Sequence, residues 1–420
     1  MAACIGFTAF SNMVCALEIS TRGGIFTEYT NNSLRTPTDE VEELEYSIQA
    51  GVGLEGASNR YNGKLDYAFT SVYFDRNTFD DRTIVVGSSN LDLVVSPDRF
   101  LWQFEHFQDY QEISSRLADV PDNRDERSVI QTGPLFTFDL SPVDQIDLGG
   151  RYVETLFDQN IGGESERVVT NLRWLHRYSP IGSVTLIGSY YDVEFKNTDL
   201  KYDQVRLGLN FSGQLKNGTY VLEGGQIKIE RDTGEETDGY YAVAELDLVY
   251  GSNAFNASYN RELTDTSLGL SLSTDFDLDF PSGDSNFDIV DIVESQRLQF
   301  DFRRTGVFSN ADLGVRAYGE KEDYENRLND ETRLGTIGYA SYRFSERVKS
   351  ELEIAYEEVD SDLLAGVNQD KEVELALVYS LNKTLNLRIS TFYRQRDNDN
   401  EPLQEYESAG ALLGLYYNSI

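Results

Sequence analysis

The sequence predicts an all-β fold, a single transmembrane antiparallel up-and-down β-barrel, and three observations support this. First, segments such as residues 60–74, RYNGKLDYAFTSVYF, alternate between apolar and polar side chains, which gives a strand one apolar face and one wet face. Second, the 420 residues are polar overall, with a mean hydropathy of -0.43, yet they include 26 Tyr and 23 Phe. Third, no stretch of about 18 apolar residues occurs, which excludes transmembrane helices but not barrel strands.

The height of the apolar band follows from residues 238–250, DGYYAVAELDLVY, where Tyr240 and Tyr250 bracket a run of apolar side chains on one face. Ten residues climb about 25 Å at about 3.3 Å per residue and a tilt of about 40°, which matches an outer-membrane apolar band between its aromatic girdles. The alternation recurs at 205–211, 298–302, 352–356, 373–381 and 385–393. We therefore expect one closed, lipid-facing wall. Candidates for its girdles are Trp102, Trp174, Tyr240, Tyr250, Tyr379 and Tyr393.

Short and long connections alternate along the chain. Nine short turns fall near residues 57, 96, 141, 179, 215, 251, 309, 345 and 381. Ten longer polar segments fall at 31–43, 75–81, 111–127, 159–165, 197–200, 231–237, 265–292, 321–331, 360–370 and 397–404. Together they predict about 20 strands, or 18 if one hairpin is merged. Short periplasmic turns and long external loops are typical of bacterial outer-membrane barrels, so both termini are expected in the periplasm.

The first residues predict export. A short apolar run without charge ends in Val14, Cys15 and Ala16, a small-residue cleavage site, so we expect a signal peptide at 1–16 and an outer-membrane β-barrel at 17–420. A buried first strand is the alternative. Both cysteines, Cys4 and Cys15, lie in this segment, so the mature chain offers no thiol for a disulfide, a nucleophile or a metal site.

The last strand resembles a recognition signal for the barrel-assembly machinery. SAGALLGLYYNSI places a polar residue, a glycine and then alternating apolar residues in the expected order, and departs from the signal in ending at Ile420 instead of an aromatic residue. This machinery is therefore an expected partner, together with outer-membrane lipid and lipopolysaccharide around the wall.

A resemblance to a known family lies in residues 91–107, LDLVVSPDRFLWQFEHF, which read as a strand, a Ser-Pro-Asp-Arg turn and an aromatic return strand. With LDYAFTSVYFDRN before it, this stretch is similar to the outer-membrane β-barrel porin family associated with PEP-CTERM and exopolysaccharide loci. The resemblance implies an outer-membrane pore near polysaccharide export, with exopolysaccharide and its export proteins as partners. No catalytic motif defines that family, so no functional residue is carried over.

The histidines argue against an enzyme. Only His106 and His176 occur, and no G-x-S-x-G sequence lies near either, whereas hydrolytic dyads and triads generally need a histidine base. We expect His176 to lie in an interfacial belt beside Trp174 and Tyr178, and His106 to have a structural or lumenal role. Two separate histidines without cysteines make a poor metal site, so no cofactor and no metal are expected.

The charge balance argues against binding to nucleic acids or to anionic membrane surfaces. Lys and Arg total 36 against 72 Asp and Glu, a net charge of -36, and such an excess opposes contact with nucleic acids. Much of it lies in the expected outer loops, with one acidic group formed by Asp119, Asp122, Asp125 and Glu126. A solvated, aggregation-resistant surface explains these carboxylates. Divalent-cation bridging to phosphate-bearing lipids, or cation enrichment at a pore mouth, is the functional alternative.

The wet face carries both signs of charge. Candidates for lining the lumen are Arg151, Arg173, Arg206, Asp247, Arg297, Arg303, Arg316, Arg388 and Arg394. They form either a salt-bridged lining that stays hydrated or a surface along which a hydroxyl-rich polymer exchanges hydrogen bonds. Tyr190, Tyr241 and Tyr318 are candidate stacking platforms for sugar rings.

Two function classes remain open. A barrel of about 20 strands has room for an aqueous lumen, which favours an outer-membrane channel associated with exopolysaccharide export, or a general diffusion porin. The other class is a plugged structural or scaffold barrel of the cell envelope, because the 265–292 loop could fold inward. The sequence does not name the substrate.

Overall fold

The computed structural model describes residues 16–114, 117–159, 161–267, 291–325, 330–362 and 366–419. Most of the expected signal peptide and residues 268–290 of the candidate plug loop lie outside the described residues, so both remain predictions. No helix in the described part of the chain is long and apolar enough to cross a bilayer.

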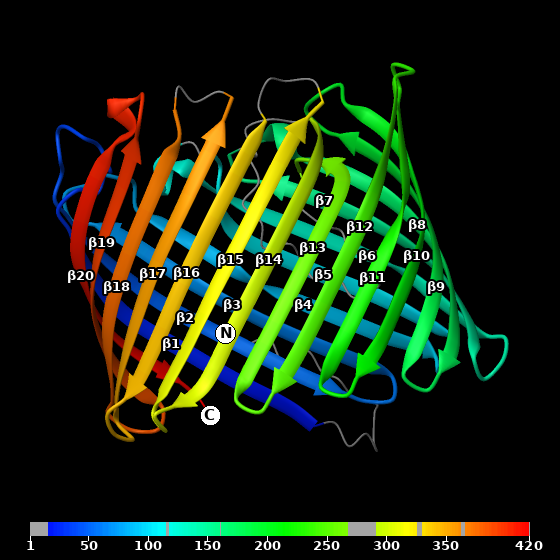
Figure 1. Cartoon of the computed structure of the whole chain (residues 1–420), viewed down its shortest axis with the longest axis horizontal. Helices are drawn as coiled ribbons and strands as arrows, with labels where there is room; N and C mark the ends of the chain where they lie inside the picture. Colours follow the sequence, from blue (N-terminus) through cyan, green and yellow to red (C-terminus); the bar gives the residue numbers. More distant parts are fainter. Residues whose placement is uncertain are drawn as a thin grey trace, which may run out of the picture.

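The described chain forms one sheet of 20 antiparallel strands (Figure 1). The strands are β1 (Ala16–Thr30), β2 (Glu43–Ala57), β3 (Tyr61–Phe74), β4 (Arg82–Ser96), β5 (Phe100–Glu112), β6 (Arg124–Asp139), β7 (Asp144–Phe157), β8 (Ser165–Ser179), β9 (Gly182–Phe195), β10 (Lys201–Leu215), β11 (Gly218–Arg231), β12 (Glu236–Tyr250), β13 (Asn253–Asp265), β14 (Ile292–Val307), β15 (Ala311–Tyr324), β16 (Glu331–Arg343), β17 (Val348–Ser361), β18 (Asn368–Ser380), β19 (Leu385–Asn398) and β20 (Tyr406–Asn418). Three 3-10 turns, η1 (Pro121–Asn123), η2 (Ile161–Gly163) and η3 (Pro402–Gln404), lie in long connections.

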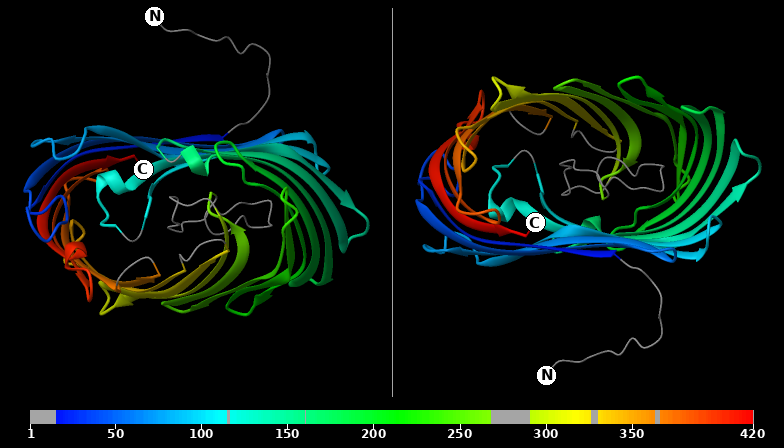
Figure 2. Two further views of the ribbon diagram at one scale, coloured as in Figure 1. Left: turned by 90° about the horizontal axis from the view of Figure 1, so that it is seen from above. Right: turned by 90° about the horizontal axis from the view of Figure 1, so that it is seen from below.

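The sheet closes on itself. Each strand pairs with its neighbours in sequence, and β1 pairs with β20 from Arg22 opposite Asn418 to Thr30 opposite Gly410. Closure leaves no free sheet edge along this pair, as a membrane-spanning sheet requires. The predicted up-and-down barrel of 20 strands is confirmed, and 18 strands is wrong. Seen along its axis, the barrel is a flattened oval (Figure 2).

Alternate side chains of the strands separate into two faces. On β8, Val168, Leu172 and Trp174 are exposed, while Arg167, Val169 and Asn171, which alternate with them, are buried. Apolar side chains that stay exposed on a closed wall face lipid, and the buried charges line the inside. All six girdle candidates are exposed.

The wall splits at its long-loop end in two places. The β4–β5 ladder stops at Gly87 opposite Gln108, yet β5 continues along β6 until Glu112 opposite Arg124. The β12–β13 ladder likewise stops at Ala242 opposite Arg261, yet β13 continues along β14 until Asp265 opposite Ile292. Both hairpins therefore leave the wall.

The contacts of their side chains show that both hairpins turn into the lumen. Leu263 has the parity of the outer face of β13, but it is buried with Ile227 and Ile229 of the inner face of β11. Tyr110 likewise has the outer parity of β5, but its hydroxyl accepts a hydrogen bond of 2.8 Å from Arg82, on the inner face of β4. We name these inward segments the β5–β6 tip (residues 109–114 and 117–124) and the β13–β14 tip (residues 262–267 and 291–292). Both lie inside the oval in Figure 2.

Candidate functional site: a lumen with a packed wall and an open wall

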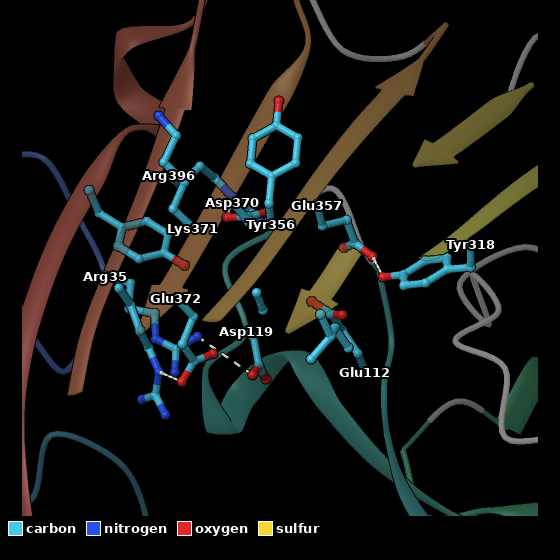
Figure 3. A pocket seen from close by; sticks show the side chains of 14 residues that line it. Arg35, Glu112, Asp119, Tyr318, Tyr356, Glu357, Asp370, Lys371, Glu372 and Arg396 are labelled. Atoms are coloured by element: carbon cyan, nitrogen blue, oxygen red, sulfur yellow. Dashed lines mark hydrogen bonds and ion pairs between the residues drawn. The ribbon is translucent and has the colours of Figure 1, made fainter. Parts of the chain in front are cut away.

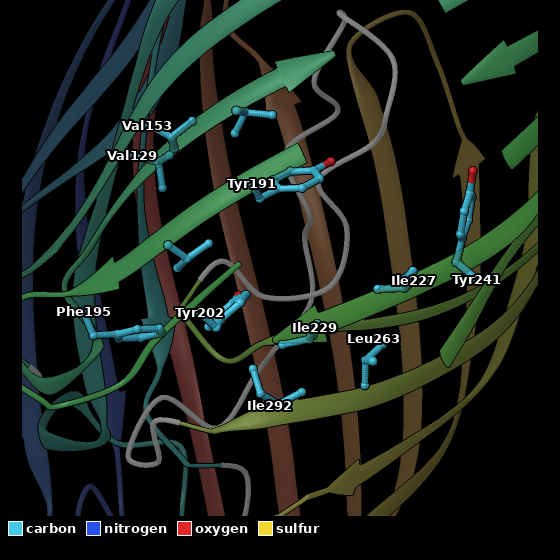
Figure 4. Packing of buried hydrophobic residues seen from close by; sticks show 12 residues of the cluster. Val129, Val153, Tyr191, Phe195, Tyr202, Ile227, Ile229, Tyr241, Leu263 and Ile292 are labelled. Atoms are coloured by element: carbon cyan, nitrogen blue, oxygen red, sulfur yellow. The ribbon is translucent and has the colours of Figure 1, made fainter. Parts of the chain in front are cut away.

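The inner face of β5 to β13 is packed. Twelve buried apolar residues, Tyr191, Tyr202, Tyr241, Ile227 and Leu263 among them, form one cluster between this face and the β13–β14 tip (Figure 4). Buried charges flank it and are paired, as burial demands. Nη2 of Arg127 lies 2.9 Å from Asp109, and Nη1 of Arg206 lies 2.9 Å from Glu262. This half of the lumen is protein interior.

The β13–β14 tip is fixed to this packed wall by an ion pair. Nη2 of Arg167, on β8, lies 2.7 Å from Oδ1 of Asp265, and their side chains are only 2% and 0% exposed. The hydroxyl of Tyr202 and the backbone N–H of Ser267 also donate to the Asp265 carboxylate. Because both charges are paired and hydrogen-bonded, their burial is tolerated, and removing either partner would leave the other uncompensated.

The opposite wall carries a ladder of arginines on β19, each beside a carboxylate on β17 or β18. Arg396 holds Asp370 through two hydrogen bonds of 2.7 and 2.8 Å. Further down, Arg394 binds Glu372 at 2.8 Å, and Arg388 binds Glu374 at 2.8 Å and Glu351 at 2.7 Å. We name these residues the arginine ladder. It offers fixed donors and acceptors side by side.

A cavity of about 210 Å³ lies at the outer end of the ladder (Figure 3). Arg394, Arg396 and Tyr406 line it from β19 and β20, and Tyr318 and Glu357 line it from β15 and β17. The Tyr318 hydroxyl donates to Glu357. This mouth cavity therefore combines aromatic rings with charged groups of both signs.

A second cavity, of about 280 Å³, lies further along the same strands. It is lined by Tyr339, Glu353 and Glu374, each two residues nearer the short turns than Ile337, Ala355 and Glu372 of the mouth cavity. Side chains two residues apart on a strand share a face. The two cavities thus follow one another down the inner face of β16 to β19, and we name this path the open wall.

The β5–β6 tip reaches the mouth cavity through Asp119. Its carboxylate lies 2.6 Å from Nε of Arg124 and 3.5 Å from Nη1 of Arg35, which belongs to the β1–β2 connection. Burial raises the pKa of Asp119, but the hydrogen bond from Arg124 and the charges of Arg124 and Arg35 outweigh it, so the pKa lies below its usual value. Asp119 therefore stays ionised and bridges two parts of the rim.

The nine candidate lumen residues lie on the packed wall, on the open wall, and on β14 and β15 between them. Arg151, Arg173 and Arg206 lie on the packed wall, where Arg151 donates to Gln103 at 3.0 Å and Arg173 lies 3.9 Å from Asp147. Arg297 and Arg316 pair with Glu320 and Asp301. Arg303 lines the second cavity, and Arg388 and Arg394 belong to the arginine ladder. Asp247, on β12, accepts a hydrogen bond of 2.7 Å from Asn256. Their part in transport stays a prediction.

The three tyrosines expected to stack on sugars separate. Tyr190 is exposed on the outer face and donates to Asp203 at 2.8 Å, so its lumenal assignment is wrong. Tyr241 is 1% exposed, with the Arg206 guanidinium 3.5 Å from its ring centre, so its ring is already covered. Tyr318 lines the mouth cavity.

Sequence reasoning missed Arg35, Arg396 and Tyr406. Asp119, expected among the outer-loop carboxylates, lines the mouth cavity, whereas the interpretation of Asp125 as a solvated loop carboxylate is wrong, because Asp125 is buried. Arg396 could have been predicted, since it lies on the same face of β19 as Arg388 and Arg394. No local pattern identifies Arg35.

Neither histidine faces the lumen. Nδ1 of His106 is hydrogen-bonded to the Tyr67 hydroxyl, and Nε2 lies 2.9 Å from the Ser128 hydroxyl. His106 has the same parity on β5 as Trp102, which faces outward. His176 lies 2.9 Å from Asp144, near the short turns. Within the described ranges, no three His, Cys, Asp or Glu side chains are grouped to hold a metal ion.

The sequence matches no family model and none of the curated proteins. Among solved structures, the chain is similar to the FrpB iron transporter (F5-1 variant) from Neisseria meningitidis, with a TM-score of 0.51 and 9% identity over 95% of this chain and 82% of that one. OpdO of Pseudomonas aeruginosa follows with a TM-score of 0.44 and 13% identity, over 96% of this chain and 97% of that one. The first likeness shows a shared barrel fold. Together with the closed, lipid-facing wall, this likeness supports the conclusion that the chain is an integral protein of the bacterial outer membrane with a channel-like fold.

Proposed function

We propose that this barrel is an aqueous outer-membrane channel that passes a hydroxyl-rich saccharide polymer along its open wall, in association with exopolysaccharide export. The arginine ladder is the observation that carries the proposal. Its paired arginines and carboxylates extend from the mouth cavity to the second cavity. Sugar hydroxyls both donate and accept hydrogen bonds, so they can exchange partners with such a wall.

The chemistry of the wall favours passage over tight binding. A conduit must release what it admits, so many weak contacts suit it better than one deep site. Tyr318 and Tyr406 add aromatic surface at the mouth, and aromatic faces pack well against the apolar side of a sugar ring. The resemblance of residues 91–107 to barrels of exopolysaccharide loci agrees with this choice of polymer.

The proposal is tested by deleting the gene and restoring it with single variants. Deletion should remove the polymer from the cell surface or leave it in the periplasm, while the envelope stays intact. Tyr318→Ala should restore export only partly, whereas Tyr190→Ala, a matched change on the outer face, should restore it fully. Normal surface polymer in the deletion strain would contradict exopolysaccharide export.

A general diffusion porin is the second candidate, favoured by the dimensions of the mouth. The mouth cavity of about 210 Å³ is smaller than the pockets of roughly 300–1,000 Å³ that hold drug-sized ligands. The Asp119 bridge also narrows the rim. Normal surface polymer together with altered uptake of small cations would favour this porin, and an intact coat without conductance would favour a scaffold.

We also propose that the chain is not an enzyme. Asp144 lies between Ser141, whose hydroxyl donates to it at 2.7 Å, and the ring of His176. The carboxylate therefore separates this serine from the histidine that would have to activate it. Absence of ester and peptide hydrolysis by the purified protein is the corresponding test.

A further inference from the structure

The split between β4 and β5 contains a cavity of about 440 Å³. Arg82 and Ile84, on the inner face of β4, line it together with Thr83 on the outer face. Tyr110 and Glu126 complete its sides from β5 and β6. Because residues of both faces and of the adjoining connections border one space, this cavity lies at the rim of the wall, where the strands meet the long loops. We name it the seam cavity.

Beyond the end of the β4–β5 ladder, the side chain of Glu126 accepts a backbone hydrogen bond that β5 would otherwise accept. The backbone N–H of Val85 has no partner on β5, because the ladder has stopped, and it donates to Oε1 of Glu126 at 3.3 Å. The other carboxylate oxygen of Glu126 accepts a hydrogen bond of 2.9 Å from Gln108. A carboxylate in this position would be costly against hydrocarbon, so the seam belongs to the wet rim above the apolar band.

The seam cavity and the mouth cavity are separated by a row of three side chains. Tyr110 lines the seam cavity, and the guanidinium of Arg124 lies 5.7 Å from the centre of its ring. Nε of Arg124 in turn lies 2.6 Å from Asp119, which lines the mouth cavity. The Arg124 side chain is 36% exposed, so water can compensate its charge when the side chain moves.

The seam cavity is acidic. Asp80, Asp122, Glu126 and Asp158 line it, against the single cation Arg82. Carboxylates on low-dielectric walls concentrate cations.

We propose that the seam between β4 and β5 is a side entrance of the channel, through which small hydrated cations reach the mouth cavity without crossing the central mouth. The route passes from the outer rim by Thr83 and Glu126, then between Tyr110 and Arg124, to Asp119. It rests on the proposed function only in requiring a conducting lumen, and it is independent of which polymer the channel passes.

The test uses charged thiol reagents on the full chain, with Cys4 and Cys15 replaced by serine. Thr83→Cys places a thiol in the seam cavity. Tyr190→Cys is the matched control, because Tyr190 is an exposed side chain on the outer face of β9 and does not line the cavity. Gln159→Cys, a second lining position, serves if the first variant does not fold. Single-channel conductance in potassium chloride is measured before and after labelling.

A positively charged adduct at Thr83→Cys should lower the potassium conductance and a negatively charged adduct should raise it, each by roughly 1.5-fold, because the adduct changes the local potential. Neither adduct should act at Tyr190→Cys. A conducting channel that ignores both adducts at Thr83→Cys, or responds equally at Tyr190→Cys, overturns the side entrance and leaves the channel intact. A protein without any conductance overturns both.

Discussion

Both tips turn from the wall into the lumen, but the contacts that hold them differ in how deeply they are buried. The β13–β14 tip is held by Arg167 and Asp265, whose side chains are 2% and 0% exposed, and Leu263 packs into the apolar cluster. The end of the β5–β6 tip is held to the β1–β2 connection by Asp119 and Arg35, whose side chains are 39% and 14% exposed. A buried pair has no substitute partner when it separates, whereas water replaces a half-exposed one. The comparison teaches that the first tip is a fixed part of the wall, whereas the end of the second tip, around Asp119, is held more weakly and can move.

The largest expected effect is at the buried ion pair. Asp265→Asn would leave the Arg167 charge uncompensated, and breaking such a buried pair costs about 3–5 kcal/mol. Loss of heat-modifiable gel mobility at a much lower temperature would report it. The double variant Arg167→Met with Asp265→Leu should recover most of the stability, and Asp203→Asn, at an outer-face carboxylate, should change little. An unaffected Asp265→Asn would mean that this tip is not fixed.

The next effect concerns the apolar side of the same tip. Leu263→Ala should destabilise the barrel by about 2–4 kcal/mol, because it leaves a cavity in packed protein. Leu246→Ala, on the exposed outer face of β12, should be milder because lipid can fill the space. The unfolding midpoint in urea compares the two variants, and equal shifts would place Leu263 on the lipid side instead.

A smaller effect is expected at the movable tip. Asp119→Asn removes a half-exposed partner of Arg124 and Arg35, which should lower the free energy of unfolding by at most about 1 kcal/mol. Conductance should nevertheless rise, because the bridge across the rim is lost. The decisive result is the split between the two readouts: a strong loss of stability without a change in conductance would make this tip as fixed as the other.

Lowering the pH should raise the conductance as Asp119→Asn does, over a narrow pH range. The pKa of Asp119 is lowered from its ordinary value of 3.8, so its ionised form contributes stability above that value, and the contribution is lost as the pH falls through the lowered pKa. Conductance of the wild-type channel should therefore increase only below about pH 4. Asp119→Asn should lack this step, and a step that persists in the variant would assign it to another group.

The sequence predicts the wall better than the lumen for a physical reason. Alternation and turn spacing are local, so the 20 strands, their two faces and the outward Tyr240 and Tyr250 can be predicted from them. Tyr110 and Leu263 also alternate correctly, yet they lie inside because their hairpins leave the wall. Parity states which face of a strand a residue occupies. It does not state whether the strand stays in the wall or turns inward past its neighbours.

The charged lining shows the same limit. Arg388 and Arg394 were predictable because they alternate with apolar residues on β19. Arg151 and Arg206 follow the same rule, but they lie on the packed wall and are buried. Whether an inward arginine borders water or protein depends on the tips, which are set by contacts between residues far apart in the sequence.

The central claim is that solute passes along the open wall and not along the packed one, and blocking by a bulky thiol reagent tests it most directly. Ser341 lines the second cavity on the open wall, and Ser189 is buried on the inner face of β9. In the background without Cys4 and Cys15, single-channel recordings should show discrete openings. The reagent should reduce them at Ser341→Cys and leave them unchanged at Ser189→Cys. Absence of openings, or a block at Ser189→Cys alone, would contradict the account.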